Sequence, residues 1–154
     1  MNLLLWGCEN WSLQQDLLCR LEVFLHRSIH RILHISITQV QEEHIRNDKV
    51  RRQFYDIPCV TNMLAARQLK FLGKVVRGPH DTPARRMLTA CCHHKRKRGR
   101  PYLHNKDVIV QNLRLLFARI PKVVIDDYGS VKYWYKEATH ESYWTALVRC
   151  LLDK

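Results

Sequence analysis

Hydrophobic positions recur with helical spacing along most of the chain. The longest run lies in residues 13–34, where apolar side chains return every three or four positions, at Leu17, Leu18, Leu21, Phe24, Leu25, Ile29, Ile32 and Leu33. Ser12 followed by Gln15 has the form of a capping box, so the pattern predicts a helix that begins near Leu13. A second strong run predicts a helix over 61–76, which Gly78-Pro79 would end.

Weaker patterns predict shorter helices between and after these two. Thr38 is the expected cap of a short helix that carries Glu42 and Glu43. Asn47 is the expected cap of another that runs through Phe54 until Ile57-Pro58 stops it. Thr82-Pro83 has the form of an N-cap followed by proline in the first helical position, and it predicts a helix that ends near residue 91.

The last part of the chain predicts helices over 108–119 and 141–152, and Val123-Val124-Ile125 is the only candidate strand. The expected fold is therefore all-α, an irregular helical bundle with an exposed basic loop. The pattern predicts three regions: a helical region over 1–90, a basic Cys/His-containing loop over 91–106 and a helical region over 107–154.

The composition is that of an ordered chain. Hydrophobic residues make up 46% of the 154 residues, with only 5 Gly and 5 Pro, which excludes a disordered basic tail. The apolar opening over residues 3–6 is too short for a signal peptide or a membrane span, so we expect a soluble, intracellular protein with no membrane partner. Without a secretory signal, the six cysteines are expected to be reduced thiols.

Charge is concentrated in the middle of the chain. The net charge is +12, with 26 Lys and Arg against 14 Asp and Glu. Residues 45–106 carry 16 basic and 3 acidic residues, a net +13, and the rest of the chain carries 10 and 11, a net −1. This excess predicts a polyanionic partner, RNA and/or DNA, that binds the central region.

Two sets of basic residues are the candidate nucleic-acid contacts. The first lies at steps of three and four on the outer side of the helix predicted over 61–76, and it consists of Arg67, Lys70, Lys74 and Arg77. Side chains with this spacing could contact successive phosphates of a nucleic-acid backbone, which would add affinity without sequence specificity. The alternative is an ordinary solvated helix face.

The second set lies around Gly99 and Pro101, and it consists of Lys95, Arg96, Lys97, Arg98 and Arg100. A Gly-Arg-Pro core flanked by arginine suits the narrow minor groove, because glycine permits close approach and proline keeps the chain extended. The same run would serve as a nuclear import signal, so the expected location is the nucleus, with assembly in the cytoplasm left open. A solvated loop is the alternative.

Metal and catalytic sites are not predicted. Four adjacent residues, Cys91, Cys92, His93 and His94, lack the ligand spacing of known zinc modules and cannot easily all face one tetrahedral ion, although a zinc site that uses some of them stays open. Asp126-Asp127 has neither a partner strand nor a third carboxylate upstream. Three histidines spaced four apart on the first helix, His26, His30 and His34, are expected to form a half-buried polar edge. No cofactor is expected.

The aromatic residues have two interpretations. Helical spacing and distance from the basic centre favour core packing over base stacking for Trp6, Trp11, Trp134, Trp144, Tyr133, Tyr135 and Tyr143. We therefore expect these side chains to be buried.

The order of motifs over roughly residues 3–107 resembles the C-terminal region of non-LTR retrotransposon reverse transcriptase polyproteins. The motifs are Leu5-Trp6-Gly7-Cys8-Glu9-Asn10-Trp11, Leu21-Glu22-Val23-Phe24, Arg31-Ile32-Leu33, Arg67-Gln68-Leu69-Lys70-Phe71-Leu72-Gly73-Lys74-Val75-Val76-Arg77 and Arg98-Gly99-Arg100-Pro101. The chain departs from the family at His34, where glycine is usual, at Lys74, where histidine is frequent, and before Asp107, where a tryptophan is usual.

The resemblance implies a thumb and post-thumb segment that grips the template–primer duplex. The metal-binding aspartates of polymerisation would belong to an upstream palm, which would be a partner of this chain where present. The chain by itself would then not be an enzyme, whereas its parent polyprotein would be an RNA-directed DNA polymerase. Two alternatives stay open: a stand-alone nuclear DNA-binding protein with a minor-groove Gly-Arg-Pro hook, and a zinc-dependent interaction domain.

Overall fold

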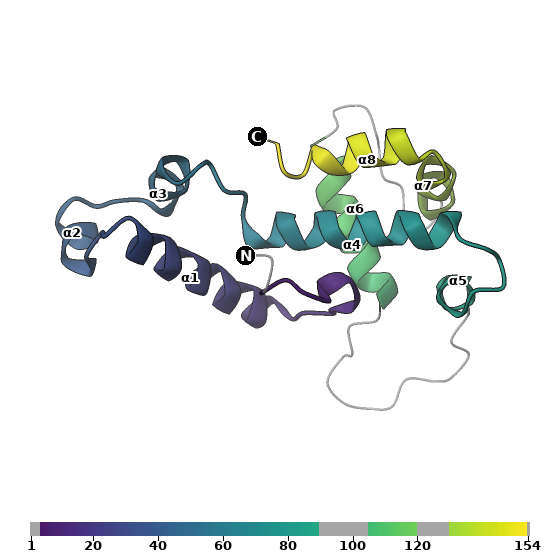
Figure 1. Ribbon diagram of the computed structural model, residues 1–154, viewed down its shortest axis with the longest axis horizontal. Helices are drawn as coiled ribbons and strands as arrows, with labels where there is room; N and C mark the ends of the chain where they lie inside the picture. Colours follow the sequence, from purple (N-terminus) through teal and green to yellow (C-terminus); the bar gives the residue numbers. More distant parts are fainter. Residues whose placement is uncertain (1–3, 90–104, 120–129, 154) are drawn as a thin grey trace. The chain divides into compact units, whose positions relative to one another are not determined.

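The computed structural model describes residues 4–89, 105–119 and 130–153 (Figure 1). These residues form an all-α fold without strands, as the sequence predicts. A short 3-10 helix at Cys8–Asn10 precedes the α-helices, which are α1 (Gln15–Ile32), α2 (Ile37–Glu42), α3 (Asn47–Gln53), α4 (Val60–Arg77), α5 (Pro83–Thr89), α6 (Asn105–Phe117), α7 (Ser130–Thr139) and α8 (Glu141–Arg149). No helix within the described residues is both long enough and apolar enough to cross a bilayer.

The chain divides into two compact units. The smaller unit is Leu13–Met63, and the larger unit combines Met1–Ser12 with Leu64–Lys154. The boundary falls inside α4, one turn after the helix begins. The three regions predicted from charge and hydrophobic pattern, 1–90, 91–106 and 107–154, have different limits from these two units. They stay predictions.

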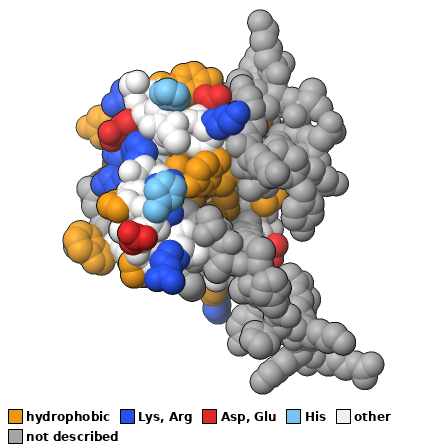
Figure 2. Space-filling model, turned by 90° about the vertical axis from the view of Figure 1, so that its right-hand side faces the viewer, with side chains coloured by type: hydrophobic (Ala, Val, Ile, Leu, Met, Phe, Trp, Pro, Cys, Tyr) orange, Lys and Arg blue, Asp and Glu red, His pale blue; other side chains and the backbone are white. Residues whose placement is uncertain are grey.

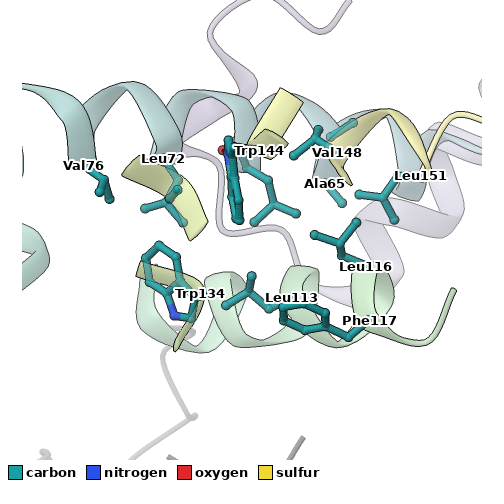
Figure 3. Close-up of a cluster of buried hydrophobic side chains, with 13 residues drawn as sticks. Ala65, Leu72, Val76, Leu113, Leu116, Phe117, Trp134, Trp144, Val148 and Leu151 are labelled. Carbon is teal, nitrogen blue, oxygen red and sulfur yellow. The ribbon is translucent and has the colours of Figure 1, made fainter. Parts of the chain in front are cut away.

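The core of the larger unit lies between α4, α6, α7 and α8. Its buried side chains are Ala65, Ala66, Leu69, Leu72, Val76, Leu113, Leu116, Phe117, Trp134, Ala138, Trp144, Val148 and Leu151. Figure 3 shows Trp144 and Leu72 between the α4 and α6 backbones, with Trp134 beside Leu72. The indole N–H of Trp144 donates to the Leu69 carbonyl oxygen at 2.8 Å, which satisfies the polar atom of the ring. Core packing is thus confirmed for two of the tryptophans.

The smaller unit depends on a polar network around Glu22 on α1. One carboxylate oxygen forms an ion pair with the Arg51 guanidinium of α3 at 3.3 Å, and the other accepts the Val60 backbone N–H at 2.6 Å. Val60 is the first residue of α4, so Glu22 satisfies one of the amides that a helix start leaves without an intrahelical partner. The network therefore ties α1 both to α3 and to the first turn of α4.

Helix starts differ from the predicted caps. Helix α2 is capped by Ser36, whose hydroxyl accepts the Gln39 N–H at 3.1 Å while the Gln39 side chain accepts the Ser36 N–H at 3.0 Å. Thr38 therefore lies inside the first turn of this helix, although Gln41 follows it at the same spacing as Gln39 follows Ser36. Ser12 does not cap α1 either, since that helix begins at Gln15 and its N-cap position is Gln14, whose side chain makes no capping hydrogen bond. Likewise, Asn47 is the first residue of α3 and not its cap.

Several apolar residues expected in the core are exposed. On α1, Leu17 is 42%, Phe24 54% and Ile32 57% exposed, while Leu25 and Ile29 are buried. At 100° per residue, Phe24 lies about 140° from Ile29 around the helix, which is too far for one neighbouring helix to cover both. Trp6 is 82% and Tyr143 is 51% exposed, so core packing is wrong for these two residues.

Candidate nucleic-acid interface

Lys70 and Lys74 are the most accessible of the four candidate cations on α4. Both side chains are exposed and lie one helical turn apart. Neither forms an ion pair with a carboxylate of the described residues. They therefore present two positive charges to solvent on the same side of the helix.

Arg67 and Arg77 stand at the two edges of the same face and turn toward neighbouring segments. From Arg67 to Arg77 the helix turns ten times 100°, which places these two residues about 80° apart with both lysines between them. Arg67 is half-buried and donates to the Leu5 carbonyl oxygen at 3.2 Å. Arg77 donates to the Ala138 carbonyl oxygen at 2.9 Å and lies 3.5 Å from the Glu141 carboxylate. Both arginines thus have structural contacts, and their part in phosphate binding stays a prediction.

Arg67 also affects a buried thiol. Burial raises the pKa of Cys8, to which the nearby Glu9 carboxylate adds, while the Arg67 guanidinium opposes the shift. A thiol with a raised pKa has little thiolate at neutral pH and is a poor nucleophile. Cys8 is accordingly part of the packing, and it is a free thiol like Cys19, Cys59 and Cys150.

Helix α5 adds cations next to the C-terminal end of α4. It begins at Pro83 after Thr82, as the sequence predicts. Arg85 donates to the Gly78 carbonyl oxygen, and its guanidinium lies 5.9 Å from the ring centre of Tyr135. Figure 2 views the larger unit from the side of this helix, and the Lys and Arg side chains drawn in blue lie among acidic and hydrophobic ones. The coloured part of that face is therefore mixed in charge.

The second predicted set of basic residues lies outside the described residues, and it consists of Lys95, Arg96, Lys97, Arg98 and Arg100. The same is true of the Cys91-Cys92-His93-His94 cluster, the Asp126-Asp127 pair and the candidate strand over 123–125. The structure therefore does not test whether these residues lie near Lys70 and Lys74.

A cleft of about 310 Å³ opens in the larger unit beside α4, α5 and α6. Its walls are largely apolar, and its polar lining includes Gln68, Asn112 and Glu9. The Asn112 amide donates to the Gln68 side-chain oxygen at 2.7 Å, and the Gln68 amide donates to the carbonyl oxygens of Cys8 and Trp11 at 3.0 and 2.7 Å. The amides of Gln68 and Asn112 are thus engaged in hydrogen bonds within the unit, and Glu9 contributes a carboxylate to the lining.

Sequence reasoning did not single out Gln68 and Asn112. Both are buried polar residues on faces otherwise occupied by apolar ones. A signal was present, because a glutamine between Arg67 and Leu69 interrupts the apolar stripe and a buried amide requires partners. The identity of those partners, 44 to 60 residues away, is not encoded in local periodicity.

The three histidines of α1 and its C-terminal end have separate environments. His26 is buried, its Nδ1–H donates to the Glu22 carbonyl oxygen at 2.9 Å and its Nε2 accepts from Arg51 at 3.0 Å. His30 is half-buried and His34 is exposed. Burial, and then the Arg51 charge, lowers the pKa of His26. Within the described part of the chain, no three His, Cys, Asp or Glu side chains are grouped as metal ligands would be.

Comparison of the chain with protein-family models, with curated proteins and with solved structures finds no match.

Proposed function

We propose that this chain is a non-catalytic, nucleic-acid-binding segment of the kind found at the C-terminal end of non-LTR retrotransposon reverse transcriptases. It would hold RNA or DNA while an upstream palm carries out polymerisation. The nucleus is the proposed place of action, because the basic run over 95–100 would also serve as an import signal. The proposed relationship to this family rests on the spaced motifs over residues 3–107.

One observation carries the binding proposal: the segregation of charge. The central 62 residues, 45–106, hold the whole net positive charge of the chain, while the remainder is close to neutral. A single-sign field of this kind attracts the phosphate backbone and releases counterions when it binds. Protein partners with mixed surface charge would gain less from it.

Lys70 and Lys74 are the proposed phosphate contacts on α4. Their ammonium groups are exposed, lie on one face of a helix whose other side is packed in the core, and make no ion pair among the described residues. The lysine ammonium is a flexible point charge, unlike the planar arginine guanidinium with its paired donors. Lysine–phosphate contacts therefore give affinity without base specificity.

The test is fluorescence anisotropy of a labelled DNA duplex titrated with the full chain at several salt concentrations. The variant Lys70→Gln/Lys74→Gln removes two proposed phosphate contacts, which should lower the slope of log affinity against log salt by about two units. Near 0.1 M salt the affinity should fall about 5- to 10-fold per lost contact. The matched control is Lys136→Gln/Arg149→Gln, which removes the same charge from exposed positions outside residues 45–106.

The outcomes are distinct. Absence of any duplex or single-strand binding at low salt would reject the proposed function. Equal effects of the two double variants would mean that total charge, and not the α4 face, determines binding. The sequence-based prediction for the basic run is tested separately with Arg98→Ala/Arg100→Ala, which should lower the salt slope by a similar amount.

A further inference from the structure

The outward face of α1 combines three arginines with one exposed aromatic ring. Arg20, Phe24, Arg27 and Arg31 follow one another at steps of four, three and four residues. At 100° per residue they lie within about 60° of one another around the helix, and they span about 16 Å along its axis. All four are exposed, on the side opposite the buried Leu25 and Ile29.

None of these arginines forms an ion pair with a carboxylate of the described residues. The ion pairs of the smaller unit involve Arg51 and Glu22, and the carboxylate of Glu22 is turned inward toward α3 and α4. The other carboxylate of α1, Asp16, lies in its first turn, one turn before Arg20. The face from Arg20 to Arg31 is therefore positive along its length.

Phe24 is not a buried core residue at this position. Its side chain is 54% exposed, and Val23 beside it is 48% exposed. A phenylalanine left in water between cations gains most from a partner that has both a flat π face and negative charge. Unpaired nucleotides offer both, whereas in a duplex the base faces are already stacked on one another.

We infer that this face of α1 binds single-stranded nucleic acid, with Phe24 stacked on an unpaired base and Arg20, Arg27 and Arg31 on the flanking phosphates. The inference rests on the proposed nucleic-acid binding and specifies its substrate class at a second surface. Stacking tolerates every base, so the contact discriminates strandedness and not sequence.

The experiment compares two labelled probes, an oligothymidylate of about 15 nucleotides and a duplex of about the same length, titrated with the full chain. Phe24→Ala should weaken binding of the single strand about 5- to 100-fold, the range expected for one lost stacking contact, and change duplex binding less than about 2-fold. Phe24→Trp should retain single-strand affinity, because an indole stacks at least as well. The matched control is Tyr143→Ala, which removes an aromatic ring of similar exposure, 51%, from α8.

A second variant, Arg20→Gln/Arg27→Gln/Arg31→Gln, tests the phosphate contacts. It should lower the slope of log affinity against log salt for the oligothymidylate by about two units, at about 0.7 per contact. These positions are exposed, so circular dichroism should show unchanged helicity in every variant. Wild-type chain that binds the duplex but not the oligothymidylate would overturn the inference and leave the proposed function standing. Unchanged single-strand affinity in Phe24→Ala, or an equal loss in Phe24→Trp, would also overturn it and would favour a protein partner for this face. A chain that binds neither probe would reject both proposals.

Discussion

The Trp144 ring occupies the space that a β-carbon on Gly73 would need. An ideal β-carbon built on Gly73 would lie 2.5 Å from both Cδ1 and Nε1 of the indole. The absence of a side chain at this helical position allows α8 to place its largest residue directly against the α4 backbone, where the indole N–H reaches the Leu69 carbonyl oxygen.

Gly73→Ala should therefore destabilise the protein, although alanine is the better helix former by about 1 kcal/mol. Overpacking of a rigid ring against backbone should lower the free energy of unfolding by about 1–3 kcal/mol after that gain. Urea unfolding followed by circular dichroism measures the difference. In a Trp144→Phe background the smaller ring leaves more room, so the loss from Gly73→Ala should be smaller; equal losses in the two backgrounds would contradict the contact.

Gln68→Leu should be strongly destabilising because it removes three hydrogen bonds at once, two of them buried and one partly buried. The Trp11 carbonyl oxygen and the Asn112 amide would lose their bond to Gln68, and the Cys8 carbonyl oxygen would keep only the Trp11 N–H, for an expected loss of about 2–4 kcal/mol in the free energy of unfolding. The shape-matched Gln68→Glu should also destabilise at neutral pH, since a carboxylate cannot donate to the two carbonyl groups. Hydrogen exchange near residue 8 should accelerate in both variants, and unchanged exchange there would contradict the network.

Substitutions of Glu22 should separate its two roles. Glu22→Gln keeps an oxygen for the Val60 N–H and removes the ion pair with Arg51, for an expected loss of about 1 kcal/mol or less, because that pair is partly exposed to solvent. Glu22→Ala removes both contacts and should cost about 1–3 kcal/mol. Urea denaturation distinguishes the two, with Glu42→Ala on α2 as an exposed control. Equal losses for Gln and Ala would mean that the Val60 contact contributes nothing.

His26 should make the smaller unit sensitive to acid. Burial and the Arg51 charge lower the pKa of His26, whereas an unfolded histidine titrates near pH 6.5. Below about pH 6.5 the unfolded chain therefore binds a proton that the folded chain does not, and the free energy of unfolding falls as the pH falls. Above that range the contribution is complete. Unfolding curves between pH 8 and 5 should show a weaker pH dependence in His26→Gln than in wild type, while the exposed-site control His80→Gln should follow wild type.

The main helices were predictable because apolar residues at a period of 3.6 are a local property. The predicted ranges 13–34, 61–76, 108–119 and 141–152 each overlap an observed helix, which confirms these elements and the all-α class. Helix α7 was not predicted. Trp134 and Ala138 have helical spacing, but Tyr133 and Tyr135 on either side of Trp134 obscure that pattern in the sequence.

The contacts that distinguish one cation from another were not predictable. Arg67, Lys70, Lys74 and Arg77 have equivalent positions in the sequence pattern. Only the fold shows that the arginines reach carbonyl oxygens at Leu5 and Ala138, 62 and 61 residues away, while the lysines remain exposed. The exposure of Phe24 was not predictable either. The spacing of apolar residues along a helix does not show how much of its apolar face neighbouring helices will cover.

The larger unit joins two stretches of chain that are synthesised at different times. Leu5 and Cys8 leave the ribosome before the whole of the smaller unit, yet the carbonyl oxygens of these two residues are held by Arg67 and Gln68 of α4. The smaller unit closes through contacts of shorter sequence separation, such as the 25 residues between His26 and Arg51, and such contacts form sooner. The segment around Leu5 and Cys8, although made before the smaller unit, is thus among the last to dock, and until α4 emerges its buried leucine and cysteine remain open to chaperones or to other nascent chains.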